Sequence, residues 1–406
     1  MLSLKNILNN FFLFFLIVSS AFGQDFNLKI QTQIFTNLEN SFFLNNYNYG
    51  IEREEFDTDI FINFKSKKFE LQFNPLINQD IIKESFFRYN FNDSSFIRIG
   101  KYYSDFSPYF NHELSSGHML ISNNSSPMKK VGFFKSKSVK KITLDFGISH
   151  GIFNKNDLYQ KAPFLHEKFI YMGIPLRDNY LGIGFIHEAM WGGESKSRGA
   201  FPSGFDNFLK VLIAADEPLR DGQPHANAIG NHLGIWEFVY QKLSNKNTLK
   251  FYYQHFFEDT SGLRFANKYD GLWGFELNDK ITKNTFLLEY LETTNQNINP
   301  PYVDDAYYNH GDYSYGWSLD RFTLGNPHIN SLEVNPVKVI HFGSKLYFGQ
   351  NISAKLLFSK KINIDSETNF LFKINKSYKK SFSNSLVLYN TSGGYGLGFI
   401  FVLTLK

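Results

Sequence analysis

The sequence contains no cysteine and has no long apolar run after its N-terminal segment. The lack of cysteine excludes a disulfide framework, a thiolate metal site and lipid attachment through a cysteine at a cleavage site. No later apolar run reaches the roughly 18 residues that a membrane-spanning helix requires. The formal net charge is only +4, and it is spread too evenly along the chain to favour nucleic acid as a partner.

The N-terminal segment has the three parts of a secretory signal. Lys5 makes its start positive, residues 11–18 form an apolar stretch, and Ala21-Phe22-Gly23 is a small-x-small cleavage site. We therefore expect residues 1–23 to be a cleaved signal peptide and residues 24–406 to form a single domain. A membrane anchor is the alternative, but the apolar stretch is short for crossing a bilayer.

The chain is rich in aromatic side chains, with 46 Phe and 23 Tyr. These residues stand at alternate positions, which is the period of a β-strand. Only helices and closed barrels satisfy their backbone hydrogen bonds inside a bilayer. An exported chain without a spanning helix and with many aromatic strands therefore predicts an all-β fold, a transmembrane antiparallel β-barrel. A large secreted β-sandwich or β-helix is the alternative.

The alternation of apolar and polar residues predicts about eighteen strands. An even number is what bacterial barrels have, and it leaves both termini on the periplasmic side. The predicted strands lie near 27–40, 56–64, 67–75, 82–91, 95–103, 129–136, 139–150, 168–176, 181–191, 231–243, 248–258, 270–279, 284–294, 338–349, 353–363, 368–377, 382–390 and 394–406.

The connections between these strands alternate between short and long. The even-numbered connections are short and polar, as periplasmic turns are, and every long loop is odd-numbered, as extracellular loops are. The long loops cover about 104–128, 192–230 and 295–337. The last strand has an unbroken apolar face from Tyr395 to Leu405 and should close the barrel against the first strand.

The face opposite the apolar face of each strand should fill the lumen. Both signs of charge occur there, so two interpretations stay open: charges that pair and brace the wall, or a polar path for solute. The predicted lumen-facing charges are Arg88, Arg98, Asp145, Glu188, Glu237, Lys250, Glu276 and Glu289.

The strand 181–191 ends at Trp191 and runs into a very long loop, which is typical of a barrel strand leaving the bilayer. In that loop, Pro202 and Ser203 precede apolar residues at helical spacing, which predicts a short amphipathic helix over 205–214. Two positions stay open for this helix: over the barrel mouth, or packed locally with no gating role.

Several segments along the chain resemble, in order and spacing, those of a known family. They are His187 to Gly193, Phe201-Pro202-Ser203, Asn231 to Gly234, Tyr253-Gln254-His255, Gly271 to Glu276 and Tyr308-Asn309-His310. Over about residues 95–345 the chain is similar to the Wzi capsule-assembly family of outer-membrane barrels. The resemblance implies eighteen strands and a non-enzymatic, lectin-like role that holds capsular or other surface polysaccharide. The better-known members have a periplasmic helical part, whereas Asp25 to Asn40 resembles a strand.

A polysaccharide site needs flat aromatic rings for the apolar sugar faces and planar polar groups for the hydroxyls. The long loops supply both kinds of side chain, and residues 295–337 concentrate them. The alternative is that these aromatics only form the interfacial belts of a barrel. The predicted polysaccharide-binding residues are Trp191, Glu194, Arg198, Tyr308, His310, Asp312, Tyr313, Tyr315, Trp317 and Arg321.

The sequence offers no constellation for metal binding or catalysis. His112 and His118 lack a spacing with defined ligand geometry, and there is no Gly-x-Ser-x-Gly elbow or cysteine nucleophile. We expect no metal, no cofactor and no enzyme; a barrel enzyme, with a serine or aspartate and a histidine within hydrogen-bond reach on one rim, is an alternative. The stronger alternative is a passive or solute-selective porin. The expected partners are surface polysaccharide and the outer-membrane lipid of a Gram-negative bacterium, with no nucleic acid and a monomeric barrel.

Overall fold

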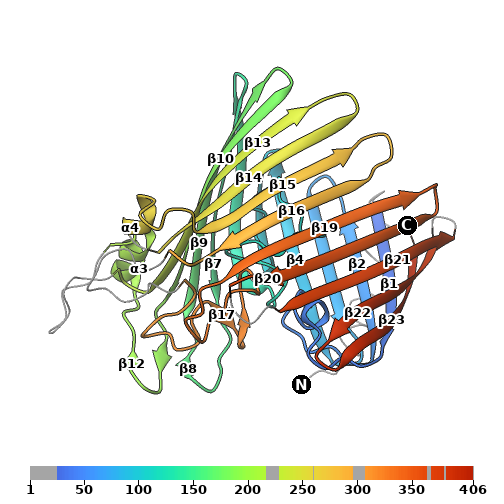
Figure 1. The fold of residues 1–406 in the computed structure, drawn as a ribbon. Helices are drawn as coiled ribbons and strands as arrows, with labels where there is room; N and C mark the ends of the chain where they lie inside the picture. The colour runs from blue at the N-terminus through green and yellow to red at the C-terminus, as the bar shows by residue number, and fades with distance from the viewer. Residues whose placement is uncertain are drawn as a thin grey trace.

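A computed structural model describes residues 25–215, 228–258, 260–295, 307–363, 367–378 and 381–405. The predicted signal peptide lies outside these residues. In the described part of the chain, eighteen antiparallel strands are hydrogen-bonded in one sheet. The first strand, β1 (Asp25–Phe35), pairs with both β2 (Phe56–Lys65) and the last strand, β23 (Gly394–Leu405), so the sheet closes into a barrel (Figure 1). This closure confirms the predicted fold.

The strands of the wall follow one another around the barrel in chain order. They match the predicted strands within a few residues, except that the first strand ends at Phe35 and not near residue 40. Besides β1, β2 and β23 they are β3 (Phe69–Leu76), β4 (Ile81–Asn92), β5 (Ser95–Tyr102), β6 (Met128–Val139), β7 (Ile142–Ile152), β9 (Phe164–Leu176), β10 (Asn179–Trp191), β13 (Asn231–Leu243), β14 (Asn247–Phe257), β15 (Gly271–Asp279), β16 (Thr285–Glu292), β19 (Lys338–Phe348), β20 (Ile352–Lys361), β21 (Thr368–Tyr378) and β22 (Phe382–Thr391).

Short helices and strands decorate the long connections at one end of the barrel. At the other end, the connections in the described ranges are short turns, as predicted (Figure 1). No helix in the described ranges has the length and apolar character to cross a membrane. The decorating elements are α2 (Phe42–Asn45), β8 (Tyr159–Lys161), β11 (Glu194–Ser195), β12 (Gly199–Ala200), α3 (Phe205–Leu212), α4 (Thr260–Leu263), β17 (Ser318–Leu319) and β18 (Phe322–Thr323).

The strand β23 shows how the two faces of the wall differ. Phe399 and Phe401 are exposed on the outer face, as expected for side chains that meet lipid. On the inner face, the Tyr389 ring occupies the space where Gly396 has no side chain; a Cβ added there would lie 2.3 Å from that ring. Glycine therefore lets a large lumenal side chain pack directly against the neighbouring backbone.

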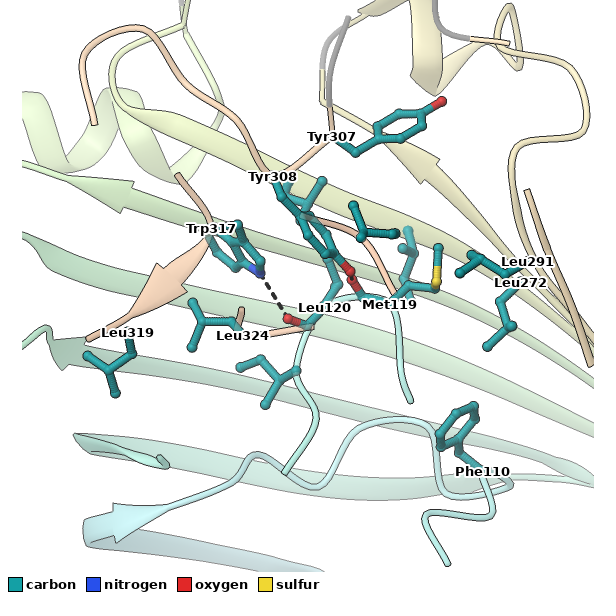
Figure 2. Packing of buried hydrophobic residues seen from close by; sticks show 14 of the residues in the cluster. Phe110, Met119, Leu120, Leu272, Leu291, Tyr307, Tyr308, Trp317, Leu319 and Leu324 are labelled. Carbon is teal, nitrogen blue, oxygen red and sulfur yellow. Dashed lines mark hydrogen bonds between the residues drawn. The ribbon is translucent and has the colours of Figure 1, made fainter. Parts of the chain in front are cut away.

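The lumen is filled by the chain itself. Residues 103–127, which connect β5 to β6 and are called the plug segment here, are largely buried inside the wall. Figure 2 shows how a second long connection packs against the plug segment. The Trp317 indole N–H donates to the Leu120 carbonyl at 2.9 Å, and the Tyr308 hydroxyl donates to the Met119 carbonyl. The hydrogen bonds of two buried rings therefore fix one loop on the other.

The helix α3 confirms the predicted amphipathic segment, and it packs on the outer wall instead of over the mouth. Its Val211 is fully buried in a cluster with Ala189 and Trp191, which lie on the outward side of β10. The Lys168 ammonium group, also on the outer face, donates to the Leu212 carbonyl near the C-terminus of the helix. The outer end of β10 is therefore covered by protein.

Candidate functional site

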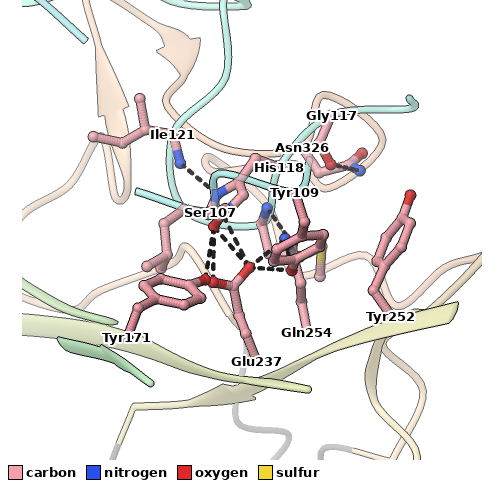
Figure 3. Close-up of polar contacts among 12 residues, drawn as sticks. Ser107, Tyr109, Gly117, His118, Ile121, Tyr171, Glu237, Tyr252, Gln254 and Asn326 are labelled. Carbon is pink, nitrogen blue, oxygen red and sulfur yellow. Dashed lines mark hydrogen bonds and ion pairs between the residues drawn. The ribbon is translucent and has the colours of Figure 1, made fainter. Parts of the chain in front are cut away.

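The plug segment is held in the lumen by buried carboxylates of the wall. The Glu237 carboxylate on β13 is fully buried and accepts hydrogen bonds from the hydroxyls of Tyr109 at 2.5 Å and Ser107 at 2.7 Å. The Gln254 amide on β14 donates to the same carboxylate at 2.7 Å (Figure 3). Because hydrogen bonds to a charged group are stronger than neutral ones, this carboxylate is a firm anchor for the plug segment.

Two further carboxylates extend this anchorage along the wall. Glu289 on β16 accepts a hydrogen bond from the Ser115 hydroxyl at 2.6 Å. Glu276 on β15 accepts from the Asn111 amide at 2.9 Å and pairs with Lys250 at 2.9 Å. All three acids were predicted to face the lumen. Their hydrogen-bond and ion-pair partners belong to the barrel wall and the plug segment.

The other predicted lumenal charges have different surroundings. Arg98 pairs with Asp105 of the plug segment at 2.5 Å, and Arg88 lies 4.0 Å from a glutamate on β3. Asp145 is half-buried on β7. Glu188 is buried, and neither of its oxygens has a hydrogen-bond partner among the described residues. Most of these charges pair with wall or plug groups, so the geometry favours bracing over an open polar path.

A serine and a histidine do meet inside the plug segment, although not in a catalytic arrangement. The Ser107 hydroxyl lies 2.7 Å from His118 Nε2. His118 Nδ1 accepts backbone N–H groups of Leu120 and Ile121 at 3.2 and 3.5 Å, so the proton stands on Nε2. Such a ring donates to the serine and cannot take its proton, as a general base must. Both side chains are also buried.

The extracellular end carries a set of accessible polar side chains. Asp157, between β7 and β9, accepts from the Tyr315 hydroxyl at 2.7 Å and pairs with Arg321 at 3.2 Å. The Asp157 and Arg321 side chains are 61% and 65% exposed. The hydrogen bond from Tyr315 is the main cause that lowers the pKa of the Asp157 carboxyl, with a smaller contribution from Arg321. A tyrosine, a carboxylate and a guanidinium are thus preorganised in one exposed group.

Neighbouring loop residues enlarge this exposed group. Arg198 pairs with Asp312 at 3.5 Å, and Lys161 pairs with Glu194 at 2.7 Å where β8 and β11 form a small sheet. His310 Nδ1 accepts the backbone N–H of Asp312 at 3.1 Å and so shapes the loop. The extracellular polar cluster is defined as Asp157, Arg198, Asp312, Tyr315 and Arg321.

Four of the aromatic residues predicted to bind polysaccharide have buried rings. Tyr308 and Trp317 pack against the plug segment, and Tyr313 packs against Tyr159 and Phe201 of neighbouring loops. Trp191 packs under α3 on the outer wall. Their faces are covered by protein, so they are not available for stacking on a sugar. Of the predicted set, the partly or fully accessible members are Glu194, Arg198, His310, Asp312, Tyr315 and Arg321.

The sequence interpretation missed Asp157 and the anchoring role of the plug segment. Asp157 stands in a polar run, Asn154-Lys155-Asn156-Asp157, within an odd-numbered connection of moderate length. That parity alone would have placed it on the extracellular side. Ser107 and Tyr109 carry no such signal, because a loop that enters a lumen has no distinctive period.

A closed antiparallel barrel of eighteen strands, with an apolar exterior and a plugged lumen, defines an outer-membrane β-barrel protein. The family model described as capsule assembly protein Wzi matches residues 113–362, more than half of the chain. The chain belongs to the Wzi capsule assembly family, and its location is the outer membrane of a Gram-negative bacterium.

The chain is similar to solved outer-membrane structures at low sequence identity, and the first of them shares its fold. Wzi of Escherichia coli, described as an outer-membrane protein involved in group 1 capsule assembly and a carbohydrate-binding β-barrel, has a TM-score of 0.62 and 14% identity over 95% of this chain and 86% of its own. OccK5 of Pseudomonas aeruginosa has a TM-score of 0.47 and 10% identity, covering 94% of this chain and 98% of its own. No curated protein matches the sequence.

Proposed function

We propose that this protein binds or anchors capsular or other surface polysaccharide at the cell surface, without chemical turnover. The observation that carries the proposal is the extracellular polar cluster, in which half-buried Tyr315 and exposed Asp157 and Arg321 are already fixed by mutual contacts. A preorganised site loses less conformational entropy when it binds a ligand. Membership of the Wzi family, and the carbohydrate binding described for the E. coli protein, support the same role.

The rigid support beneath the cluster fits a binding role. Tyr315 belongs to the same connection as Trp317 and Tyr308, whose buried rings are bonded to the plug segment. The plug segment is in turn bonded to Glu237 and Glu289 of the wall. A load applied by a long glycan would therefore be transmitted to the barrel through hydrogen-bonded and tightly packed contacts.

A porin is the second candidate function. The plug segment argues against it, because a porin keeps a continuous aqueous path through its lumen. Non-enzymatic action is supported by the surroundings of Ser107, which is buried, donates to the Glu237 carboxylate of the wall and accepts from His118 Nε2.

The proposal is tested by retention of purified surface polysaccharide on the folded barrel, together with single-channel conductance in a planar bilayer. We expect saturable retention and no large, steady conductance. Replacing Arg321 with alanine (Arg321→Ala) removes a cation and a tyrosine partner from the cluster and should weaken retention about tenfold or more. Lys141→Ala, at an exposed periplasmic turn, is the matched control and should change nothing.

Two results would overturn the proposal. Large, steady conductance that polysaccharide leaves unaltered would identify a porin. Equal retention of polysaccharide by the Arg321→Ala and Lys141→Ala variants would show that the extracellular polar cluster is not part of the binding site.

A further inference from the structure

The plug segment leaves a cavity in the lumen beside β1. Its volume is about 420 Å³, within the range of roughly 300–1,000 Å³ that small-molecule sites occupy. Its lining includes the amides of Asn27 and Gln31, the Tyr49 ring, and the cations Lys29 and Arg53. Asn27 is two residues from the start of β1, so the cavity extends toward the periplasmic end of the barrel.

Two polar atoms of the cavity lining lack partners. Asn27 Oδ1 and Arg53 Nη1 are buried and make no hydrogen bond with any described residue. The rest of the Arg53 guanidinium is fixed, since Nη2 donates to Asn48 at 3.0 Å and Nε to the Leu44 carbonyl at 3.3 Å. Buried polar atoms normally have partners, so a fixed guanidinium donor and an amide acceptor that lack partners in a cavity lining indicate a bound group.

The basic character continues around the inner wall. Lys345, Lys355 and Lys373 are direct register partners across β19, β20 and β21. Lys345 pairs with Glu113 at 2.7 Å, whereas Lys355 and Lys373 have no acidic partner among the described residues. Lys29 of the cavity lies close enough to Lys373 for their charges to repel each other. We call Lys29, Lys355 and Lys373 the lumen lysine group.

The acids nearest the cavity are already engaged. Asp59 pairs with Lys83 at 2.7 Å. Asp57 accepts from the Gln79 amide at 3.1 Å and lies near Arg53. Neither acid pairs with the lumen lysine group, so these lysines have no counter-charge among the described residues, and a bound anion would supply one.

We propose that the cavity and the lumen lysine group form a second binding site, which takes a carboxylate-bearing saccharide from the periplasmic side. The lysines and Arg53 would bind the carboxylates, and Asn27 and Gln31 would bind hydroxyls. Tyr49 adds a flat ring for an apolar sugar face. The choice of a saccharide over a simple anion rests on the proposed function, while the positive charge of the site does not.

Calorimetric titration of the folded mature barrel in detergent tests this site. The probe is trigalacturonate, and uncharged maltotriose of the same length is the comparison ligand. We expect trigalacturonate to bind about tenfold or more tightly than maltotriose. The Lys355→Gln/Lys373→Gln double variant should lose about tenfold or more in affinity for trigalacturonate. Lys376→Gln, on the outward side of β21, is the matched control and should bind as the wild type does.

A variant that fails to fold is recognised by its gel mobility without heating, and Lys29→Gln then replaces the double variant. Equal affinity for the two trisaccharides, absence of trigalacturonate binding, or full affinity in a folded lysine variant would each overturn the lumenal site. Loss of trigalacturonate binding only in Arg321→Ala would also overturn it while leaving the extracellular function intact. Lysine-dependent binding without retention of polysaccharide would support the lumenal site and reject the proposed function.

Discussion

At the scale of single residues, the aromatic side chains of the long loops act mainly as internal supports. Tyr308 and Trp317 are almost completely buried, and each donates a hydrogen bond to a carbonyl of the plug segment. A buried ring with a satisfied polar tip combines a large apolar contact with a directional bond. These two residues therefore determine where the loop that carries Tyr315 sits.

Tyr308→Phe should destabilise the barrel measurably. The hydroxyl donates to the Met119 carbonyl and accepts the Asn326 N–H at 3.0 Å, and the substitution leaves both groups buried and unpaired. A loss of about 1–3 kcal/mol is expected, read from the urea midpoint in micelles. Tyr269→Phe, at a tyrosine that is 66% exposed, is the control. Equal midpoints for the two variants would contradict this role of Tyr308.

Loop tyrosines whose hydroxyls are shielded from water also predict a loss of stability in alkali. Burial raises the pKa of Tyr47, Tyr109 and Tyr308 well above the usual value near 10. Folding keeps these phenols neutral, so the stability they contribute is complete below about pH 10 and is lost as the pH rises toward the folded values.

Tyrosinate absorbance measured during an alkaline titration checks this expectation. Only the exposed tyrosines should ionise near pH 10 in the folded barrel, and the buried ones should ionise together with unfolding. Ionisation of all tyrosines near pH 10, with the barrel still folded, would show that these rings are accessible.

The residue-scale predictions from sequence succeeded where a strand fixed the direction of the side chain. Glu237 follows from the alternation of its strand, which assigns it to the inner face. Trp317 and Tyr308 lie in a loop, where composition cannot distinguish a ring that meets ligand from one that packs on another loop. Only the long-range contact with residues 119 and 120 resolves that difference.

At the scale of elements, the strands were predictable because the face of each strand that meets lipid must be apolar. The strand β13 matches its predicted range at both ends. The outer end of β10 was not predictable in the same way. His187, Ala189 and Trp191 continue the outward alternation, but α3 covers this part of the wall. A distant amphipathic segment can replace lipid as the apolar partner, and the strand alone carries no sign of it.

Val211→Asp should release α3 from the outer wall. Val211 is fully buried between Ala189, Trp191 and Ile229, and an unpaired carboxylate there would be strongly unfavourable. Hydrogen exchange should become fast at the amides of α3 while the wall strands stay protected. Ile213→Asp is the control, because Ile213 is 74% exposed. Protection of α3 in the Val211→Asp variant would show that other contacts hold the helix.

At the scale of the whole molecule, acidic and basic side chains of the lumen lie on different strands of the wall. The acids on β13, β15 and β16 bind the plug segment. Lys29 on β1 lines the remaining cavity, and Lys355 and Lys373 on β20 and β21 have no acidic partner among the described residues. The mixed charges in the lumen were predictable from alternation, but this separation was not, because it depends on which strands the plug segment contacts.

Because wall carboxylates bind the plug segment, removing these carboxylates should open the lumen. In the Glu237→Ala/Glu289→Ala double variant, Ser107, Tyr109 and Ser115 lose their acceptors, so the plug segment should leave the wall. We expect a closed wild-type barrel and a double variant with frequent, large open-channel events in a planar bilayer.

Asp145→Ala is the control for that recording, because Asp145 is a half-buried lumenal acid with no hydrogen bond to the plug segment. It should remain closed, like the wild type. A folded double variant that also stays closed would show that the buried contacts of Tyr308 and Trp317 suffice to hold the plug segment. In that case the wall carboxylates orient the plug segment without keeping it in place, and the barrel is sealed from its extracellular loops inward.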